Sequence, residues 1–186
     1  MKLYISLLHY PVYNKNHVKI ASALTNLDLH DLSRLAKTYG AKRFFVITPL
    51  VDQQELAGRI LEHWTVGYGA SYNTHRKEAI ELIEIRSSLE EAVGEIREVE
   101  ADRPILIATD ASTCVEKPLA FRSAINILQT GKPVFILFGT AWGLHREVIE
   151  KVDFLLEPIR GNTDYNHLSV RTAAAIILDR LAGRDL

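Results

Sequence analysis

The sequence has a single cysteine, Cys114, among 186 residues, and no apolar run approaches the length of about 20 residues that a membrane helix needs. One cysteine excludes a disulfide within this sequence and is typical of a reducing cytosol. The apolar start at 3–8 is too short for a signal-peptide core and precedes no small-residue cleavage site. We therefore expect a cytoplasmic protein without a membrane span.

Charge of one sign is also lacking, because 22 basic residues stand against 23 acidic ones and the formal net charge is −1. A protein that binds nucleic acid mainly by neutralising phosphates is normally basic. The balance disfavours a stand-alone nucleic-acid clamp. It remains compatible with an enzyme that touches RNA over a small patch, especially one shared between two subunits.

The two common nucleotide-binding fingerprints are missing from the glycine-containing turn in "FILFGTAWGLHREVIEKVD", residues 135–153. A Walker loop needs GxxxxGK[ST], and a dinucleotide loop needs GxGxxG. Here an apolar strand breaks at Gly139 and Gly143 and leaves as a helix. Such a turn usually holds a polar or anionic group on backbone amides, so we expect a ligand site of another kind.

Metal-binding spacing is absent as well. The seven histidines form no HxxxH pair, and one cysteine cannot form CxxC, so no metal site is expected. A catalytic thiol at Cys114 is a less favoured alternative.

Strand-like and helix-like runs alternate along the whole chain, with no Pro/Gly/Ser-rich linker and no repeat. Strict alternation predicts one α/β domain over 1–186, with a mostly parallel six-stranded sheet and helices on both faces. The expected strands lie within 2–10, 43–49, 81–87, 104–109, 133–139 and 153–159. The expected helices lie within 29–40, 52–64, 88–100, 118–131, 144–152 and 171–183.

Several helix ends are marked by their residue types. Asp52 and Ser88 are expected N-terminal caps, the latter with Glu91 in a capping-box pattern. Gly40 and Gly131 stand where helices should end. The stretch 65–76 interrupts the alternation as a long loop or broken helix, read either as a surface excursion or as a contact with a partner or RNA.

Three C-terminal motifs, in order, resemble the SPOUT superfamily of RNA methyltransferases. "LFGTAWGL" is similar to its glycine motif, "EPIRG" to its second turn, and "HLSVRTAAAIIL" to the entry of its alanine-rich last helix. In "NLDLHDLSRLAKTYG", Arg34 and Gly40 keep the spacing of the ribose-methylating branch. The sequence most resembles a little-characterised bacterial SPOUT family, some members of which are fused to tRNA guanine-N1 methyltransferase.

The resemblance implies a C-terminal trefoil knot, a cofactor and a dimer. The knot and cofactor region would span about 105–182, and S-adenosylmethionine would lie bent within it, held largely by backbone groups. The protein would act on RNA, tRNA or rRNA, as a homodimer whose interface completes each active site. The implied cofactor contacts are Ala108, Thr109, Phe138, Gly139, Thr140, Gly143, Leu156, Glu157, Pro158, His167 and Leu168.

The catalytic roles follow from the same resemblance. Arg34 would position or activate the acceptor hydroxyl, although arginine does not readily give up its proton. Asp164 and His167 are alternative bases, and histidine titrates near neutral pH. Ala141 replaces the family's Glu, His167 its Ser and Ser169 its Asn. The family's Asn is not in register, because Asp28 stands six residues before Arg34 and Asn26 two further back. These departures leave the methylated atom open, with the ribose 2′-oxygen as one candidate.

Two other functions stay open. A non-catalytic knotted module could bind S-adenosylmethionine or recruit another RNA-modifying enzyme. A generic doubly wound enzyme with a small phosphorylated substrate would require the order of the three motifs to be ignored.

Overall fold

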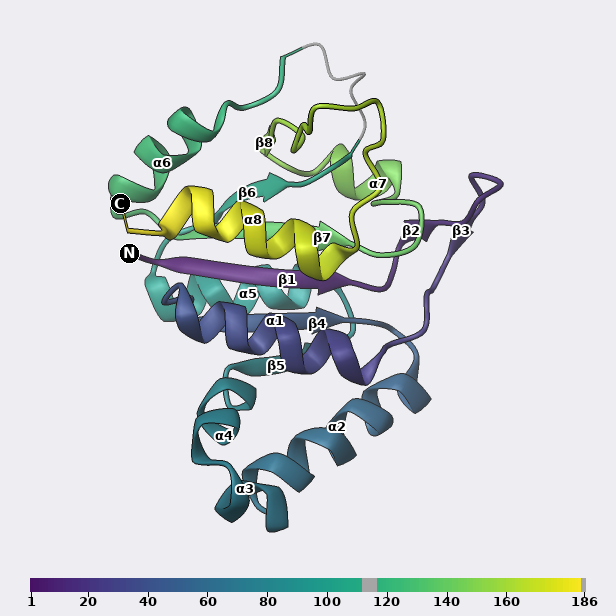
Figure 1. The fold of residues 1–186 in the computed structure, drawn as a ribbon, viewed down its shortest axis with the longest axis vertical. Helices are drawn as coiled ribbons and strands as arrows, with labels where there is room; N and C mark the ends of the chain where they lie inside the picture. Colours follow the sequence, from purple (N-terminus) through teal and green to yellow (C-terminus); the bar gives the residue numbers. More distant parts are fainter. Residues whose placement is uncertain (112–116, 185–186) are drawn as a thin grey trace.

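The protein is built on a six-stranded sheet, seen in a computed structural model that describes residues 1–111 and 117–184 (Figure 1). The strand order is β5-β4-β1-β7-β6-β8, and every neighbouring pair is parallel. The strands are β1 Leu3–Leu8, β4 Arg43–Ile47, β5 Ile83–Arg86, β6 Ile105–Ala108, β7 Val134–Gly139 and β8 Phe154–Leu155. The predicted α/β fold with a parallel six-stranded sheet is confirmed.

Helices cover both faces of the sheet, as the alternation predicts. The larger layer contains α1 Asn26–Thr38, α2 Val51–Thr65, α4 Thr74–Ile80, α6 Phe121–Gln129 and α8 Val170–Ala182. The opposite face is covered by α5 Leu89–Glu100 and the single-turn α7 Arg146–Ile149. Within the larger layer α1 packs against α8 and against α4. Helix α1 carries Arg34, the residue predicted to act on the acceptor hydroxyl.

The two central strands supply both cores because successive side chains point to opposite faces. Ile5 and Phe138 are buried under the larger layer, whereas Tyr4 and Phe135 are buried under α5 and α7. Full burial of a large apolar side chain contributes about 1.5–3 kcal/mol. This two-sided burial makes β1 and β7 the rigid support on which the carboxyl-end loops stand.

The helix-end predictions have mixed outcomes. Ser88 accepts from the Glu91 amide at 3.2 Å, which confirms the cap, and Gly40 and Gly131 adopt φ of +69° and +79° at helix ends. Asp52 is not an N-cap: α2 begins one residue earlier, and Leu50 occupies the cap position without a side-chain bond. Asp52 lies instead in the first turn, where a carboxylate favours the positive end of the helix dipole.

One of two short features was not predicted. Residues Val12–Tyr13 and Lys19–Ile20 form an unexpected two-stranded antiparallel hairpin, β2–β3, beside the carboxyl end of β1. The 65–76 stretch is a broken helix, one of its two predicted forms, with α3 at Tyr68–Tyr72 ahead of α4. Among the helices of the described residues, none combines the length and apolar character needed to span a membrane.

Candidate functional site

Three loops meet at the carboxyl ends of β6, β7 and β8. The Thr109 amide donates to the Leu137 carbonyl at 3.0 Å, and the Leu156 amide donates to the Ala108 carbonyl at 2.9 Å. Farther out, the Asn166 side-chain amide donates to the carbonyl of residue 111 at 2.8 Å. Segments up to 55 residues apart are thereby held together at the end of a parallel sheet, where α/β proteins usually bind ligands.

The glycine loop after β7 has a backbone that only small side chains permit. A Cβ on Gly139 would lie 2.9 Å from Leu144 Cγ and 3.0 Å from the Leu144 amide nitrogen. Ala141 and Gly143 adopt φ of +53° and +98°, in the left-handed region that favours glycine. Gly139 is therefore required by the packing of Leu144 onto the strand end, whereas the sequence suggested a close approach to ligand.

Hydrogen bonds to the chain after β1 fix the outer part of this loop. The Trp142 amide donates to the Tyr13 carbonyl at 3.0 Å, and the His145 amide donates to the Pro11 carbonyl at 3.1 Å. These amides are therefore already used within the protein. The Trp142 side chain is 62% exposed at the rim.

The Thr140 side chain turns into the protein. Its hydroxyl donates to the Leu8 carbonyl at 3.0 Å and lies 2.6 Å from Ser22 Oγ, which in turn lies 3.0 Å from His9 Nδ1. If Thr140 donates to Leu8, then Ser22 donates to Thr140 and accepts from the His9 ring. Burial lowers the pKa of His9, against an opposing effect of the Asp28 carboxylate, so His9 is neutral near pH 7. Thr140 therefore acts as a support for the loop.

Glu157 is also engaged inside the protein. Its carboxylate accepts from the Phe121 amide at 2.7 Å, at the first turn of α6, where the N-cap residue makes no side-chain bond. Its own amide donates to the Leu119 carbonyl at 2.9 Å. Leu156 and Pro158 on either side are buried. Leu156, Glu157 and Pro158 are therefore better suited to face a ligand through backbone atoms than through the Glu157 carboxylate.

The loop 160–169 is the exposed wall of the site. Asp164 and His167 are exposed, and the His167 ring lies edge-on to Tyr165 with ring centroids 5.5 Å apart. Leu168 is 44% exposed, an unusual position for a leucine in a loop that carries polar neighbours. Ser169 then caps α8 by accepting from the Thr172 amide at 3.3 Å.

Arg34 lies in an open groove of about 500 Å³ between α1 and α8, which Ser169 at the end of the 160–169 loop also lines. Its side chain is exposed and makes no hydrogen bond or ion pair within the described part of the chain. Within the described residues, Arg34 makes no hydrogen bond or ion pair with Asp164 or His167. The groove is lined by Asp31, Arg34, Leu35, Thr38, Ser169, Arg171, Thr172 and Ala175.

Arg171 is a charged residue of this groove that the sequence analysis did not single out. It donates to the Asp28 carboxylate at 2.8 Å and lies 3.3 Å from the Asp31 carboxylate. The Asp28 side chain is 8% exposed and also accepts from Thr25 at 2.6 Å. The signal that could have identified Arg171 was a guanidinium at the entry of an alanine-rich helix. For His9, it was a histidine directly after a buried strand.

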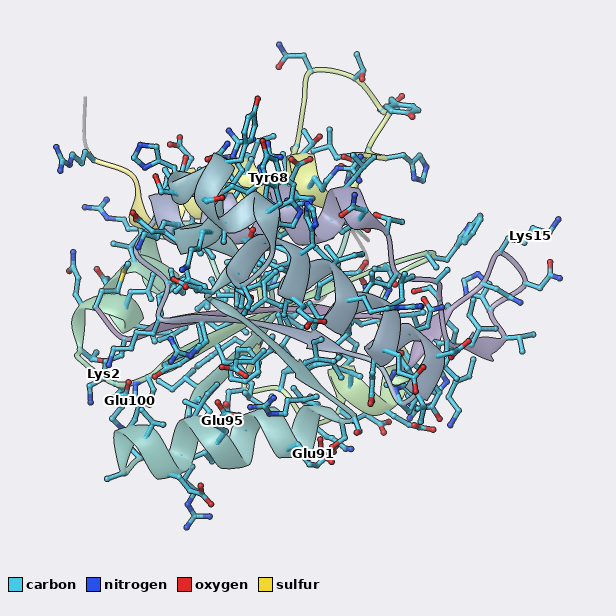
Figure 2. The ribbon with its side chains drawn as sticks, turned by 90° about the horizontal axis from the view of Figure 1, so that it is seen from below. Lys2, Lys15, Tyr68, Glu91, Glu95 and Glu100 are labelled. Carbon is cyan, nitrogen blue, oxygen red and sulfur yellow. The ribbon has the colours of Figure 1, made fainter. Side chains whose placement is uncertain are left out.

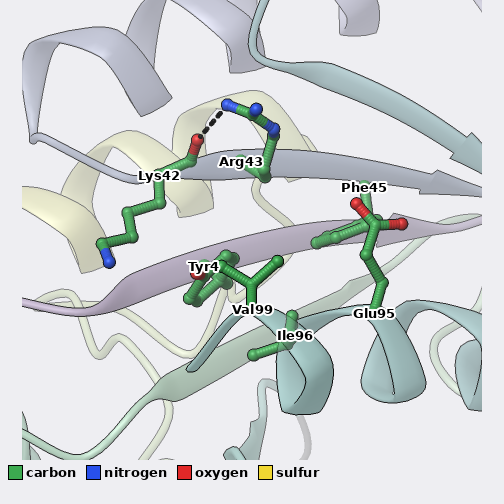
Figure 3. A pocket seen from close by; sticks show the side chains of 7 residues that line it. All are labelled: Tyr4, Lys42, Arg43, Phe45, Glu95, Ile96 and Val99. Carbon is green, nitrogen blue, oxygen red and sulfur yellow. Dashed lines mark hydrogen bonds between the residues drawn. The ribbon is translucent and has the colours of Figure 1, made fainter. Parts of the chain in front are cut away.

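A second cavity, of about 250 Å³, lies on the α5 face toward the amino ends of β1 and β4 (Figure 3). It contains none of the predicted site residues. Its lining is Tyr4, Lys42, Arg43, Phe45, Glu95, Ile96 and Val99. Near it Glu100 binds Lys2, Lys42 and the Tyr4 hydroxyl at 2.9, 2.6 and 2.6 Å, which holds the pKa of Glu100 at about 2 (Figure 2). This cluster fastens α5 to the sheet.

The carboxyl-end loops are chemically compatible with S-adenosylmethionine. This ligand has a planar adenine ring, polar groups and no phosphate, and the loops carry the exposed side chains of Trp142, Tyr165 and Leu168 and no phosphate-binding motif. In the described residues no group of three His, Cys, Asp or Glu side chains is arranged to hold a metal ion. Cys114 lies outside the described residues.

Comparison with known proteins identifies the family of this chain. Residues 2–183 match a family described as SAM-dependent RNA methyltransferase. A tRNA (guanine-N(1)-)-methyltransferase of Oleidesulfovibrio alaskensis is 46% identical over 184 residues, which is 99% of this chain and 43% of that protein. The chain thus spans less than half the length of this relative.

Solved structures share the fold at low identity. A probable methyltransferase from Bordetella pertussis superposes with a TM-score of 0.67 at 16% identity, covering 97% of this chain and 94% of that one. The SpoU methyltransferase AviRb from Streptomyces viridochromogenes gives 0.61 at 17% identity, covering 97% and 58%. The predicted resemblance to S-adenosylmethionine-dependent RNA methyltransferases is confirmed, and the chain belongs to that family.

Proposed function

We propose that this chain is a methyltransferase that uses S-adenosylmethionine to methylate RNA, either tRNA or rRNA. The observation that carries the proposal is the convergence of the β6, β7 and β8 loops at one end of the sheet, tied by the bond from Asn166 to residue 111. Single-domain action over 1–186, a C-terminal knot over about 105–182 and a cytoplasmic location are parts of the same proposal.

The cofactor would be held by the walls of these three loops. Backbone groups near Ala108, Gly139 and Leu156 would face it, with Leu168 covering its apolar part. Bound there, S-adenosylmethionine would supply an electrophilic methyl group. Thr140 and Glu157 would act indirectly, since each side chain already supports a neighbouring element.

Arg34 would serve the acceptor side across a homodimer interface. Its guanidinium is exposed and has no partner within the described part of its own chain, which supports a role toward a second subunit or toward RNA. Because arginine retains its proton, Arg34 would orient the acceptor oxygen or a flanking phosphate. As the oxygen takes the methyl group, its proton would pass to Asp164 or His167, the two exposed bases of the 160–169 loop.

A non-catalytic S-adenosylmethionine-binding module, or a partner subunit of another RNA-modifying enzyme, is the second candidate. The departures Ala141, His167 and Ser169 and the net charge of −1 favour it. Cofactor binding without methyl transfer to RNA would support it against the enzyme.

Calorimetric titration with S-adenosylmethionine and S-adenosylhomocysteine tests the proposal first. Saturable binding of both is expected, followed by transfer of radiolabelled methyl groups to bulk tRNA or rRNA. No binding at millimolar ligand would exclude the enzyme and the S-adenosylmethionine-binding module, and would leave only the partner subunit. Binding without transfer to either RNA pool would leave the module.

A further inference from the structure

The crossover between β4 and β5 carries more structure than a parallel sheet needs. Three helices, α2, α3 and α4, form a projection that ends at α3 (Figure 1). Trp64 is its centre: the Arg76 guanidinium lies 4.5 Å from the ring centroid, and the His30 ring meets it edge-on at 5.3 Å. A Cβ on Gly69 would lie 2.6 Å from Trp64 Cε3. The short α3 is therefore seated directly on this ring and has a defined position.

Two tyrosines stand on the outer surface of α3. Tyr68 and Tyr72 are four residues apart, so they share one helix face. Their rings stack with centroids 5.9 Å apart and an interplanar angle of 25°. They are 74% and 75% exposed. A paired aromatic surface is thus presented to solvent on a fixed support.

The charge balance of the protein favours stacking as its source of RNA affinity. With a net charge of −1, the chain has no overall positive charge to attract phosphates. Stacking of bases on aromatic rings requires no net charge and tolerates any base. Around the tip, residues 59–77 contain three basic residues and one acid, Glu62, together with His63 and His75. Glu78 and Glu81, just beyond, are paired with Lys37 and Lys77.

The projection lies on the acceptor side of the molecule. α4 packs against α1, the helix that carries Arg34. Tyr68 lies on the opposite side of the sheet from Glu95 on α5 (Figure 2). The helix that carries Arg34 and the projection that carries the two tyrosines therefore belong to the same side of the sheet.

We infer that Tyr68 and Tyr72 form a stacking platform for unpaired bases of the RNA substrate, outside the methyl-transfer site. The inference rests on the proposed function, since it assigns where that substrate is held. The platform binds single-stranded or looped RNA in preference to duplex, whose bases are already stacked. The salt dependence of this binding is shallow, because few phosphates are neutralised.

Fluorescence anisotropy with a labelled twelve-nucleotide oligouridylate and a twelve-base-pair RNA duplex tests the platform. The wild type binds the single strand more tightly. The double variant Tyr68→Ala/Tyr72→Ala weakens that binding by about tenfold or more, the range expected for loss of stacked bases. Tyr68→Phe/Tyr72→Phe, which keeps both rings, retains it.

Val99→Ser is the matched control, because Val99 is an apolar side chain 68% exposed on α5. It leaves oligouridylate binding unchanged. Titration with S-adenosylmethionine on the same samples separates failure of the proposed function from failure of the platform. Absence of cofactor binding by the wild type contradicts the proposed function. If the alanine variant binds cofactor normally and binds RNA as tightly as the wild type, only the platform is overturned. No oligouridylate binding by the wild type overturns it too. The platform is also overturned if the alanine variant binds RNA normally but has a different oligomeric mass, because the tyrosines would then contact another protein subunit.

Discussion

The proposed cofactor side and the proposed acceptor side of this molecule are built in different ways. On the cofactor side the loop after β7 is fixed by backbone: Gly139 admits Leu144, Ala141 and Gly143 take left-handed conformations, and amide hydrogens bind the chain after β1. On the acceptor side, between α1 and α8, position is fixed by charged side chains, chiefly the contacts of Arg171 with Asp28 and Asp31.

The two sides should respond differently to substitution. The backbone of the β7 loop leaves no room for an added Cβ at Gly139, where Leu144 packs. The groove between α1 and α8 depends on charged pairs, so the loss of one charge there should be offset by a change of its partner. Gly139 and Gly143 keep the pattern of the resemblance, whereas Ala141 in the same loop and Asp28, His167 and Ser169 outside it depart from that pattern. The predictions below test this contrast, from the largest expected effect to the smallest.

Gly139→Val should abolish S-adenosylmethionine binding, because the new side chain would collide with Leu144 and displace the loop. Overpacking of this kind costs about 1–3 kcal/mol of unfolding free energy. Calorimetry and urea denaturation measure the two effects. Gly58→Ala is the control: a Cβ there meets nothing within 4 Å, and the helix should gain about 0.5–1 kcal/mol. Unchanged cofactor binding in Gly139→Val would contradict the backbone account.

Arg34→Ala should lower methyl transfer about 100-fold, the size of effect seen when one group that stabilises a transition state is removed. Binding of S-adenosylmethionine should be unaltered, because Arg34 lies outside the three loops. Rates with radiolabelled methyl donor, beside calorimetry, separate the effects. Lys37→Ala, one turn later on α1 with only an exposed contact to Glu78, should retain activity. Normal transfer by Arg34→Ala would refute its assignment to the acceptor.

Arg171→Met should destabilise the protein by about 1–3 kcal/mol, because it leaves the Asp28 carboxylate, 8% exposed, without its cation. Losing one partner of a fully buried pair costs about 3–5 kcal/mol, and the half-exposed arginine reduces this. Adding Asp28→Asn should restore part of the loss in urea denaturation. Lys19→Met, which breaks only the exposed pair with Glu147, should cost less than about 1 kcal/mol. Equal losses of unfolding free energy in Arg171→Met and Lys19→Met would show that the pair of Arg171 with Asp28 contributes no more than an exposed ion pair.

Glu100→Gln should lower the stability of the protein near neutral pH and make that stability less sensitive to acid. The folded-state pKa of Glu100 is about 2, below its usual 4.5, because Lys42, Tyr4 and Lys2 bind the carboxylate. A depressed folded pKa stabilises the protein above pH 4.5, and that contribution is lost as the pH falls from 4.5 toward 2. The variant should therefore lose less stability than the wild type over this interval in pH-dependent unfolding, and methyl transfer at pH 7 should be unchanged. An altered transfer rate would tie this distant cluster to the site.

Much of the fold was predictable because its signals are local. Apolar runs such as 133–139 and the cap at Ser88 depend on neighbours a few residues away, and the structure confirms them. Asp52 was misassigned as a cap because Leu50, the actual cap residue, carries no side-chain signal. The strands β2 and β3 were missed because two residues are too few to show a period.

The sequence by itself determined the alternation of strands and helices, the glycine loop at the end of a buried strand and the order of the three motifs. These follow from side-chain periodicity and backbone freedom, which are properties of short segments. Only the tertiary structure decided that Leu144 is what Gly139 must admit, that Arg171 pairs with Asp28 across 143 residues, and that two tyrosines stack on a helix seated on Trp64. Those contacts depend on the packing of whole elements against one another, so no local pattern in the chain specifies them.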